Sequence, residues 1–332
     1  MGKCLETILG GVTQKMETPV IYFHGKSNRP LTVKVDFPKG IISQWYPEAD
    51  GFAPLVGSID PSNLGGGSMT WKVALNPEGF SPPAVDPGDI WAPSRNVPST
   101  PLRAWGEDEN FIFYRGIGRF SLPFRTIADA NGDVTVRNDD ALDVPAAFAI
   151  RVDETGGGIV SLGAVRAGRS VKARADLPTK DMAVFLNDAR TQIAAALEDS
   201  GLTSEESLAM VDTWTVSYFH TPGLRVLYVL PRAWTDALLP MSLDFVPSRV
   251  VRTLVGRIEV TTPAEEETIR LAAEKSFTAA ESGSWFYLES LPEIAKLGRH
   301  AEAKVRAARL GVPEGPFGEF LDAAIDTMQG NP

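Results

Sequence analysis

The chain has 332 residues, 43% of them hydrophobic, which is enough to build the core of one large or two ordinary domains. Its formal net charge of -10 opposes binding to a phosphate backbone, so we expect no nucleic-acid partner. No run of residues reaches the roughly 18 apolar positions of a membrane span, and residues 1–18 lack the apolar core of a signal peptide. We expect a soluble protein, either cytoplasmic or exported as a mature chain.

The first half of the chain predicts β-structure after an N-terminal extension at residues 1–18. Short runs rich in Val, Ile and aromatic residues alternate with turns that contain Gly, Pro or Asn. Such a series indicates an antiparallel β-sandwich or an open barrel over residues 19–177. The runs are residues 20–24, 31–37, 41–46, 69–75, 110–114, 134–138, 147–152, 159–165 and 170–175.

A proline-rich stretch interrupts these strands. Seven prolines occur between residues 77 and 101, with few apolar residues around them. We expect residues 80–101 to form a long surface loop over the β unit, and loops of this length are usually functional or disordered. The nearby Trp91 and Trp105 are expected to anchor it.

Residues 178–262 predict a mixed α+β region. Apolar residues follow the helical period from about residue 179 to Gly201. Thr203 and Glu206 form the pattern of a capping box for a second helix, which ends near Asp212. The remaining elements are extended runs at 214–219 and 224–230, a short helix at 232–239, and strands at 241–246 and 250–260.

Residues 263–332 predict a helical tail, so the fold class is α+β. Thr262 as N-cap, Pro263 as first helical residue and Glu265 as third predict a helix to about residue 280. Helical periodicity returns at residues 291–310 and 317–328. The last helix carries an apolar stripe that requires a cover, either the protein's own β unit or a partner. This stripe is formed by Phe317, Phe320, Leu321 and Ala324.

One segment has oxygen ligands at the spacing of a calcium loop. These are Asp129, Asn131, Asp133 and Asp140. Val134 stands where such a loop needs glycine, and Arg137 would bring a cation to the ion. Because Asn-Gly is also the preferred pair of a tight hairpin turn, we expect a turn without metal or other cofactor, with calcium as the weaker alternative.

An acidic run next to Trp105 is a first candidate for hydrolysis. Glu107, Asp108 and Glu109 precede a predicted strand, and glycosidases use paired carboxylates. Adjacent side chains of an extended chain point to opposite faces, so these three cannot form the pair among themselves. A solvated loop is the simpler interpretation.

A second candidate for catalysis surrounds the only histidine in the mixed region. The set that could transfer protons is Asp212, Tyr218, His220 and Arg225. On an extended segment Tyr218 and His220 share one face, whereas Ser217 points to the other. A polar strand edge without catalytic function is the alternative interpretation.

Aromatic and guanidinium groups at predicted strand ends suggest a ligand-binding surface. Tryptophan and tyrosine favour contacts with apolar or sugar faces and with protein partners, although they are also common core residues. The candidate ligand-binding residues are Trp45, Tyr46, Trp105, Tyr114 and Arg115.

Several phrases of the sequence occur together in a known group of proteins. They are METPVIYFH, QWYP, FYRGIG, LRVLYVLPR and VGRIE, in this order. Over residues 16–265 the chain resembles a group of bacterial proteins of unknown function. The resemblance implies a bacterial source and a shared fold, and it carries no activity.

We therefore expect a non-catalytic binding or structural protein that presents aromatic loops on a β framework to an unknown ligand or protein partner. The alternative is a hydrolase, with either a carboxylate pair or a site around Tyr218, His220 and Arg225.

Overall fold

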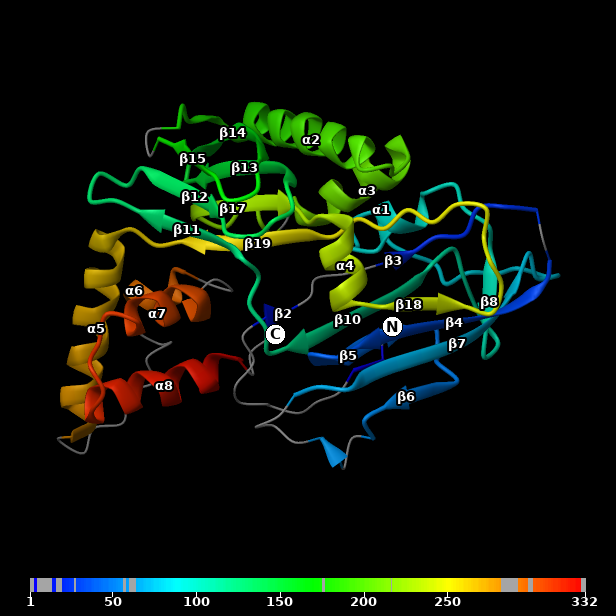
Figure 1. Cartoon of the computed structure of the whole chain (residues 1–332), viewed down its shortest axis with the longest axis horizontal. Coiled ribbons are helices and arrows are strands. Elements are labelled where there is room, and N and C mark those ends of the chain that lie inside the picture. Colours follow the sequence, from blue (N-terminus) through cyan, green and yellow to red (C-terminus); the bar gives the residue numbers. More distant parts are fainter. Residues whose placement is uncertain are drawn as a thin grey trace.

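The computed structural model describes residues 3–4, 14–15, 20–26, 28–55, 58–59, 64–174, 177–215, 217–281, 292–297 and 301–329. Within these ranges, four antiparallel sheets and eight helices form an α+β fold without a closed barrel (Figure 1). The predicted fold class is confirmed.

Two facing sheets make up the first part of the molecule. One sheet has the order β1 (Lys3–Cys4), β5 (Gly40–Tyr46), β10 (Ile112–Gly118), β2 (Gln14–Lys15), and β3 (Val20–Ile21) also pairs with β10. The other has the order β18 (Met241–Leu243), β4 (Pro30–Phe37), β7 (Gly67–Leu75), β8 (Leu102–Ala104), β9 (Glu107–Glu109), with β6 (Gly51–Ala53) beside β7. Alternate side chains of β4 and β7 share one buried core with residues of β5 and β10, as in a sandwich.

The proline-rich loop covers the outer face of the first sheet, as the sequence predicts. It contains a short helix, α1 (Ala92–Arg95). The ring of Trp91 lies 4.5 Å from that of Phe113 and 6.2 Å from that of Phe111. Trp91 therefore anchors the loop. Trp105 does not, because it is 67% exposed at the tip of the β8–β9 hairpin.

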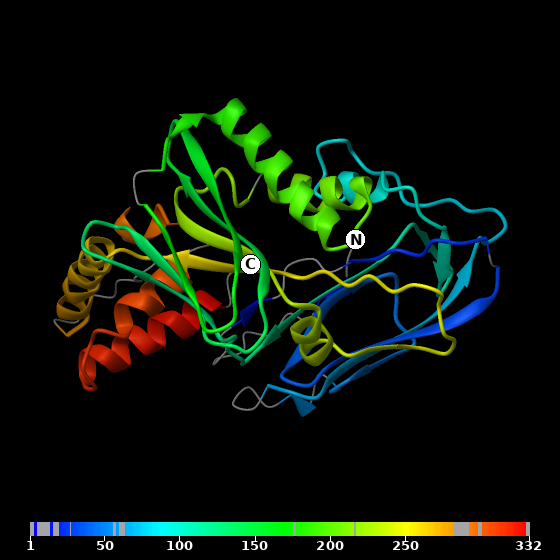
Figure 2. The ribbon, with the colours of Figure 1, turned by 45° about the horizontal axis from the view of Figure 1, so that its top comes forward.

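A second pair of sheets follows. The smaller contains β11 (Phe124–Ala128), β12 (Val134–Asn138) and β15 (Ser170–Ala173). The larger has the order β16 (Lys180–Asp181), β14 (Gly156–Val165), β13 (Val144–Val152), β17 (Gly223–Val229), β19 (Val255–Val260). Helices α2 (Met182–Asp199) and α3 (Ser204–Trp214) lie across one face of the larger sheet (Figure 2). Strands from both sides of residue 177, the predicted domain boundary, thus pair in one sheet.

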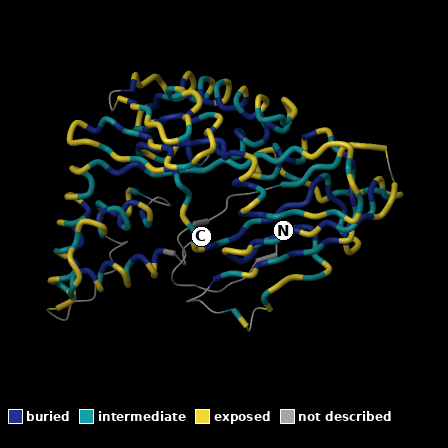
Figure 3. The backbone as a smooth tube through the Cα atoms, viewed as in Figure 1, coloured by how far each residue is buried: buried dark blue, intermediate teal, exposed yellow. Residues whose placement is uncertain are grey.

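The end of the chain returns to the sandwich and then forms the helical tail. After α4 (Arg232–Leu238), strand β18 pairs with β4. The tail contains α5 (Pro263–Glu281), α6 (Pro292–Ala295), α7 (Ala301–Arg309) and α8 (Pro316–Gln329) around a core of its own. The rings of Phe317 and Phe320 both lie 5.6 Å from that of Phe277 on α5. Helices of the tail, rather than the β unit, cover the apolar stripe of α8. Figure 3 shows the buried positions along both sheet pairs and on the inner sides of the helices.

Local signals place the helix starts correctly. Thr203 Oγ1 accepts a hydrogen bond from the Glu206 N–H at 3.2 Å, and Glu206 Oε2 accepts from the Thr203 N–H at 2.8 Å. Thr262 and Glu265 form the same reciprocal pair at the start of α5, with distances of 3.2 and 2.9 Å. Both predicted helix N-termini are confirmed. Each capping box joins residues only three positions apart, so the local sequence encodes it.

The extended run predicted at residues 214–219 is wrong. Helix α3 continues to Trp214, and the Tyr218 N–H still donates to the Trp214 carbonyl at 2.8 Å, so the chain turns here instead of extending. The argument that Tyr218 and His220 share a strand face therefore fails. Residue 216, residues 298–300 of the predicted helix at 291–310, and most of the N-terminal extension lie outside the described residues.

Candidate functional site

A groove with a volume of about 710 Å³ lies between the two sheets of the second pair. Strand β14 forms one wall, β15 with Arg174, Leu177 and Pro178 forms the other, and the start of α2 closes one end. The residues that line it are Gly157, Gly158, Ile159, Val160, Ser161, Leu162, Val171, Lys172, Ala173, Arg174, Leu177, Pro178, Lys180, Phe185 and Asp188.

The groove follows the edges of two strands. Consecutive residues of a strand point alternately to its two faces, so a run of neighbours can line one groove only along the strand's edge. Ile159 packs in the cluster beneath α2, whereas its neighbour Val160 packs in the cluster toward the smaller sheet. The groove therefore exposes the main chain of β14 as well as its side chains.

Neither of these edges is paired along its length. On this side β14 pairs with β16 only at Gly156 and Gly157, and no other described strand pairs with it there. β15 is the last strand of its sheet and pairs only with β12 among the described strands. Two rows of backbone N–H and C=O groups thus border the groove from opposite sides.

The lining combines apolar side chains with positive charge. Ile159, Val160 and Leu162 supply apolar surface from β14. The lining includes three basic residues, Lys172, Arg174 and Lys180, and one acidic residue, Asp188. Lys180 and Asp188 form an ion pair with an N–O distance of 2.5 Å. Among the described lining residues basic side chains outnumber acidic ones, whereas the whole chain has a net charge of -10.

The inner end of the groove requires glycine. A Cβ at Gly157 would lie 2.7 Å from Cδ1 of Phe185, and a Cβ at Gly158 would lie 2.6 Å from the Pro178 carbonyl oxygen. Both distances are too short for a side chain, so the glycines let α2 and the segment 177–178 approach the strand closely. The run Gly156–Gly158 serves packing at this end of the sheet.

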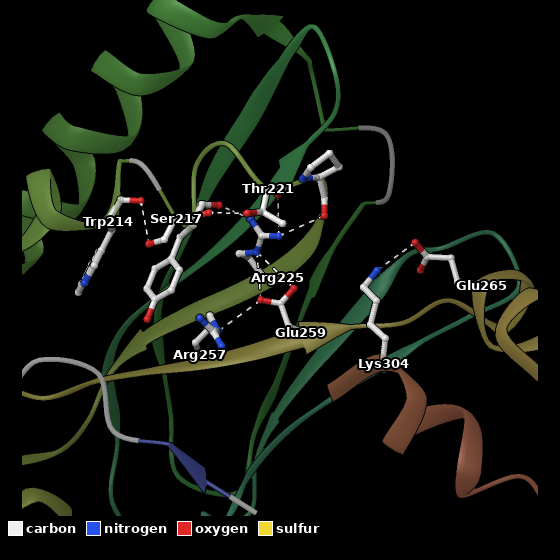
Figure 4. A network of polar contacts seen from close by, with 10 residues as sticks. Trp214, Ser217, Thr221, Arg225, Arg257, Glu259, Glu265 and Lys304 are labelled. Carbon is white, nitrogen blue, oxygen red and sulfur yellow. Dashed lines mark hydrogen bonds and ion pairs between the residues drawn. The ribbon is translucent and has the colours of Figure 1, made fainter. Parts of the chain in front are cut away.

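A buried charge network lies on the same sheet, two strands from β14 (Figure 4). Arg225 on β17 is fully buried, and its Nε donates to the Glu259 carboxylate at 3.1 and 3.3 Å. Its Nη atoms donate to the carbonyls of Tyr218, Thr221 (2.9 Å) and Pro222 (3.4 Å). Burial lowers the pKa of Arg225 from its ordinary value. The guanidinium thus binds the turn after α3 to the sheet.

Two further cations border this network. The guanidinium of Arg257 lies 4.5 Å from the centre of the Tyr218 ring, and its Nε lies 3.4 Å from Glu259 Oε1. Lys304 of the tail is 1% exposed and donates to Glu265 at 3.2 Å. The Arg257 contacts fix the turn against the sheet, and the Lys304–Glu265 contact joins α7 to α5 within the tail.

The proposed proton-transfer residues do not form one site. Tyr218 and Arg225 meet, but through the Tyr218 main-chain carbonyl and not its hydroxyl. Asp212 accepts from Arg190 on α2 at 2.7 and 3.1 Å, and His220 Nδ1 donates to the Thr215 carbonyl at 2.5 Å. None of the four candidate residues lines the groove.

The acidic run is a strand and not a solvated loop, which corrects the prediction. Asp108 and Glu109 on β9 are buried. Asp108 accepts from Arg103 at 2.6 and 2.8 Å, and this guanidinium and the Ser81 N–H lower the pKa of its carboxyl. Glu109 accepts from Arg95 at 2.9 and 2.7 Å. The two carboxylates point to opposite faces, as predicted, and both hold the proline-rich loop.

Most of the predicted ligand-binding aromatics are core residues. Trp45 and Tyr114 are directly opposite each other on β5 and β10, 6% and 4% exposed, and face the sandwich core. Tyr46 is 8% exposed beneath the proline-rich loop. Arg115 donates to Gln44 Oε1 on the neighbouring strand at 3.3 Å. Because β5 and β10 are inner strands with both faces covered, their aromatic ends do not reach a ligand surface.

The segment from Asp129 forms the predicted hairpin turn between β11 and β12. Asp129 Oδ1 accepts from the N–H groups of Asn131 (2.9 Å) and Asp133 (3.1 Å). Asp140 lies beyond the far end of β12 and accepts from Trp234 Nε1 at 3.1 Å. Five strand residues span about 16 Å, so Asp140 cannot join the other oxygens around one ion. Among the described residues, no group of three His, Cys, Asp or Glu side chains could hold a metal.

The groove was not predicted from the sequence. A weak signal is present, because three glycines precede an apolar run and a second short strand follows within a few residues.

In the described part of the chain, no helix is long and apolar enough to cross a bilayer.

Comparisons with models of known families, with curated proteins and with solved structures give no match to this chain. The resemblance to a group of bacterial proteins remains a prediction.

Proposed function

We propose that the protein is a non-catalytic binding protein and that its ligand occupies the groove between β14 and β15. The single observation that supports this best is the groove itself, because its volume of about 710 Å³ is that of an ordinary ligand site. Its apolar walls, together with the basic lining residues Lys172, Arg174 and Lys180, favour a ligand that is partly apolar and negatively charged. The aromatic residues that the sequence suggested as a ligand-binding surface do not line this groove.

The contacts of the acidic residues favour binding over hydrolysis. Asp108 and Glu109 accept charge-assisted hydrogen bonds from arginines, and Asp212 pairs with Arg190. A general acid or base must reach a substrate proton, whereas these carboxylates bind neighbouring parts of the same chain.

The test uses two anionic apolar probes, 8-anilinonaphthalene-1-sulfonate and dodecanoate. Both should bind saturably to the native protein, the first with a rise in fluorescence and the second by displacing it. The variant Ser161→Tyr places a ring in the groove from an exposed position of β14, and it should weaken both probes about tenfold or more.

The matched control is Ser242→Tyr, which makes the same change at an exposed serine of β18, in the other pair of sheets. It should bind both probes like the native protein. Equal binding by Ser161→Tyr and the native protein, or no saturable binding of either probe, would contradict the proposed function.

A further inference from the structure

We propose that residues 81–87 form a preorganised docking site, the proline ridge, for a partner protein whose binding groove is lined by aromatic side chains and bordered by basic residues. None of the seven residues lines the groove between β14 and β15. The docking site is therefore separate from the proposed ligand site.

The backbone of the proline ridge is extended. Residues 81–86 form no helix, strand or turn. Proline fixes φ at about −65° and holds the residue before it in the extended region. Pro82, Pro83 and Pro87 thus favour a polyproline II helix across the segment. In the described part of the chain, no group donates a hydrogen bond to the carbonyls of residues 81–85, so these oxygens can accept from a partner.

Side-chain exposure along the ridge follows the three-residue period of a polyproline II helix. Between residues 82 and 87, the two half-buried positions are Pro82 and Val85, three residues apart. The other four positions are exposed. One edge of the helix therefore lies against the protein, and the two edges that carry Pro83 and Pro87 face the solvent.

Both ends of the ridge are fixed to the folded protein. The Ser81 N–H donates to the buried carboxylate of Asp108 at 2.7 Å. At the other end, Asp86 closes a turn by accepting from the Gly88 N–H at 2.9 Å, and Trp91 then anchors the loop on the first sheet. A segment that is already held in its bound conformation loses less entropy on binding than a free peptide.

The chemistry of the ridge specifies the partner. Tryptophan and tyrosine rings pack against exposed proline rings, and their N–H and O–H groups donate to carbonyls, as in modules that recognise polyproline II segments. Residues 78–90 contain no Lys or Arg and three acidic residues, Glu78, Asp86 and Asp89. Basic residues beside the aromatic groove would therefore favour the complex. A second copy of this chain, with its net charge of -10, does not offer that complement.

The first experiment titrates the full-length protein into a panel of purified SH3 and WW domains labelled with nitrogen-15, because these modules carry aromatic grooves. At least one domain with a basic groove border should bind saturably with a Kd below about 1 mM. Its chemical shifts should change at the aromatic groove residues, and added salt should weaken the complex. Binding by no domain of the panel, or shift changes away from the aromatic groove, would overturn the inference.

The second experiment tests the ridge itself with the domain that binds best. Pro83→Ser removes a ring from a solvent-facing edge and should weaken binding at least about fivefold. The matched control is Pro313→Ser, the same change at an exposed proline between α7 and α8, and it should bind like the native protein. Circular dichroism should show that both variants fold. Equal affinity of Pro83→Ser and the native protein would contradict the assignment of the docking site.

The last measurement tests preorganisation. A capped peptide of residues 78–90 has the same sequence without the anchors at Asp108 and Trp91, so it should bind the same domain more weakly than the full-length protein does. A free peptide that binds as tightly as the whole protein would show that the fold does not preorganise the ridge.

Discussion

Replacement of Arg225 by methionine should destabilise the protein strongly. Methionine keeps much of the length and apolar volume of the arginine stem but removes every donor. Glu259, 1% exposed, would lose the guanidinium that donates to it at 3.1 Å and would retain Arg257 at 3.4 Å. The carbonyls of Thr221 and Tyr218 would lose their common partner.

The magnitude follows from the burial of the pair. Removal of one member of a buried ion pair typically costs about 3–5 kcal/mol, because the remaining charge is left in a low-dielectric site. We expect the lower half of this range, since Arg257 is 23% exposed and can still neutralise part of the charge on Glu259. The assay is equilibrium unfolding in urea, followed by the summed fluorescence of the seven tryptophans.

Two further variants control this experiment. Arg190→Met removes an exposed pair with Asp212, in which the side chains are 45% and 34% exposed, and should cost about 1 kcal/mol or less. The double variant Arg225→Met with Glu259→Leu removes both buried charges and should be more stable than Arg225→Met alone. If Arg225→Met costs no more than Arg190→Met, or if the double variant is the least stable, the assignment of Arg225 as a buried anchor is wrong.

Three other changes have defined expectations. Thr203→Ala removes the side-chain oxygen that accepts from the Glu206 N–H, so the free energy of unfolding should fall by about 1 kcal/mol in urea titrations. Asp108→Asn tests a pH dependence. Arg103 holds the pKa of Asp108 in the folded protein below its unfolded value of about 3.9. The carboxylate therefore stabilises the fold above that pH, and this contribution is lost as the pH falls through the folded pKa. The stability difference between native protein and Asp108→Asn should therefore shrink between about pH 5 and 2, and a constant difference would contradict this. Trp105→Ala removes a ring that is 67% exposed and should change the free energy of unfolding by less than about 0.5 kcal/mol. A larger loss of stability in calorimetry would show that the ring makes a contact not recognised in the structure.

Sequence alone determined the features that depend on neighbouring residues. The capping boxes at Thr203 and Thr262 and the turn at Asp129 join atoms only a few positions apart, so their geometry is encoded locally. The alternation of apolar residues likewise predicted most strands and the α+β class.

Tertiary structure decided which side chains are buried and where a ligand can bind. Glu109 is buried because Arg95, on a loop 14 residues earlier, folds back onto it. Trp45 lies in the core because its strand pairs with the strand that carries Tyr114, far along the chain. The groove exists because β14 and β15 separate and, among the described strands, do not pair with each other. A local sequence pattern cannot predict contacts between residues far apart in the chain, or the missing pairing between β14 and β15. Both depend on how the sheets pack against each other.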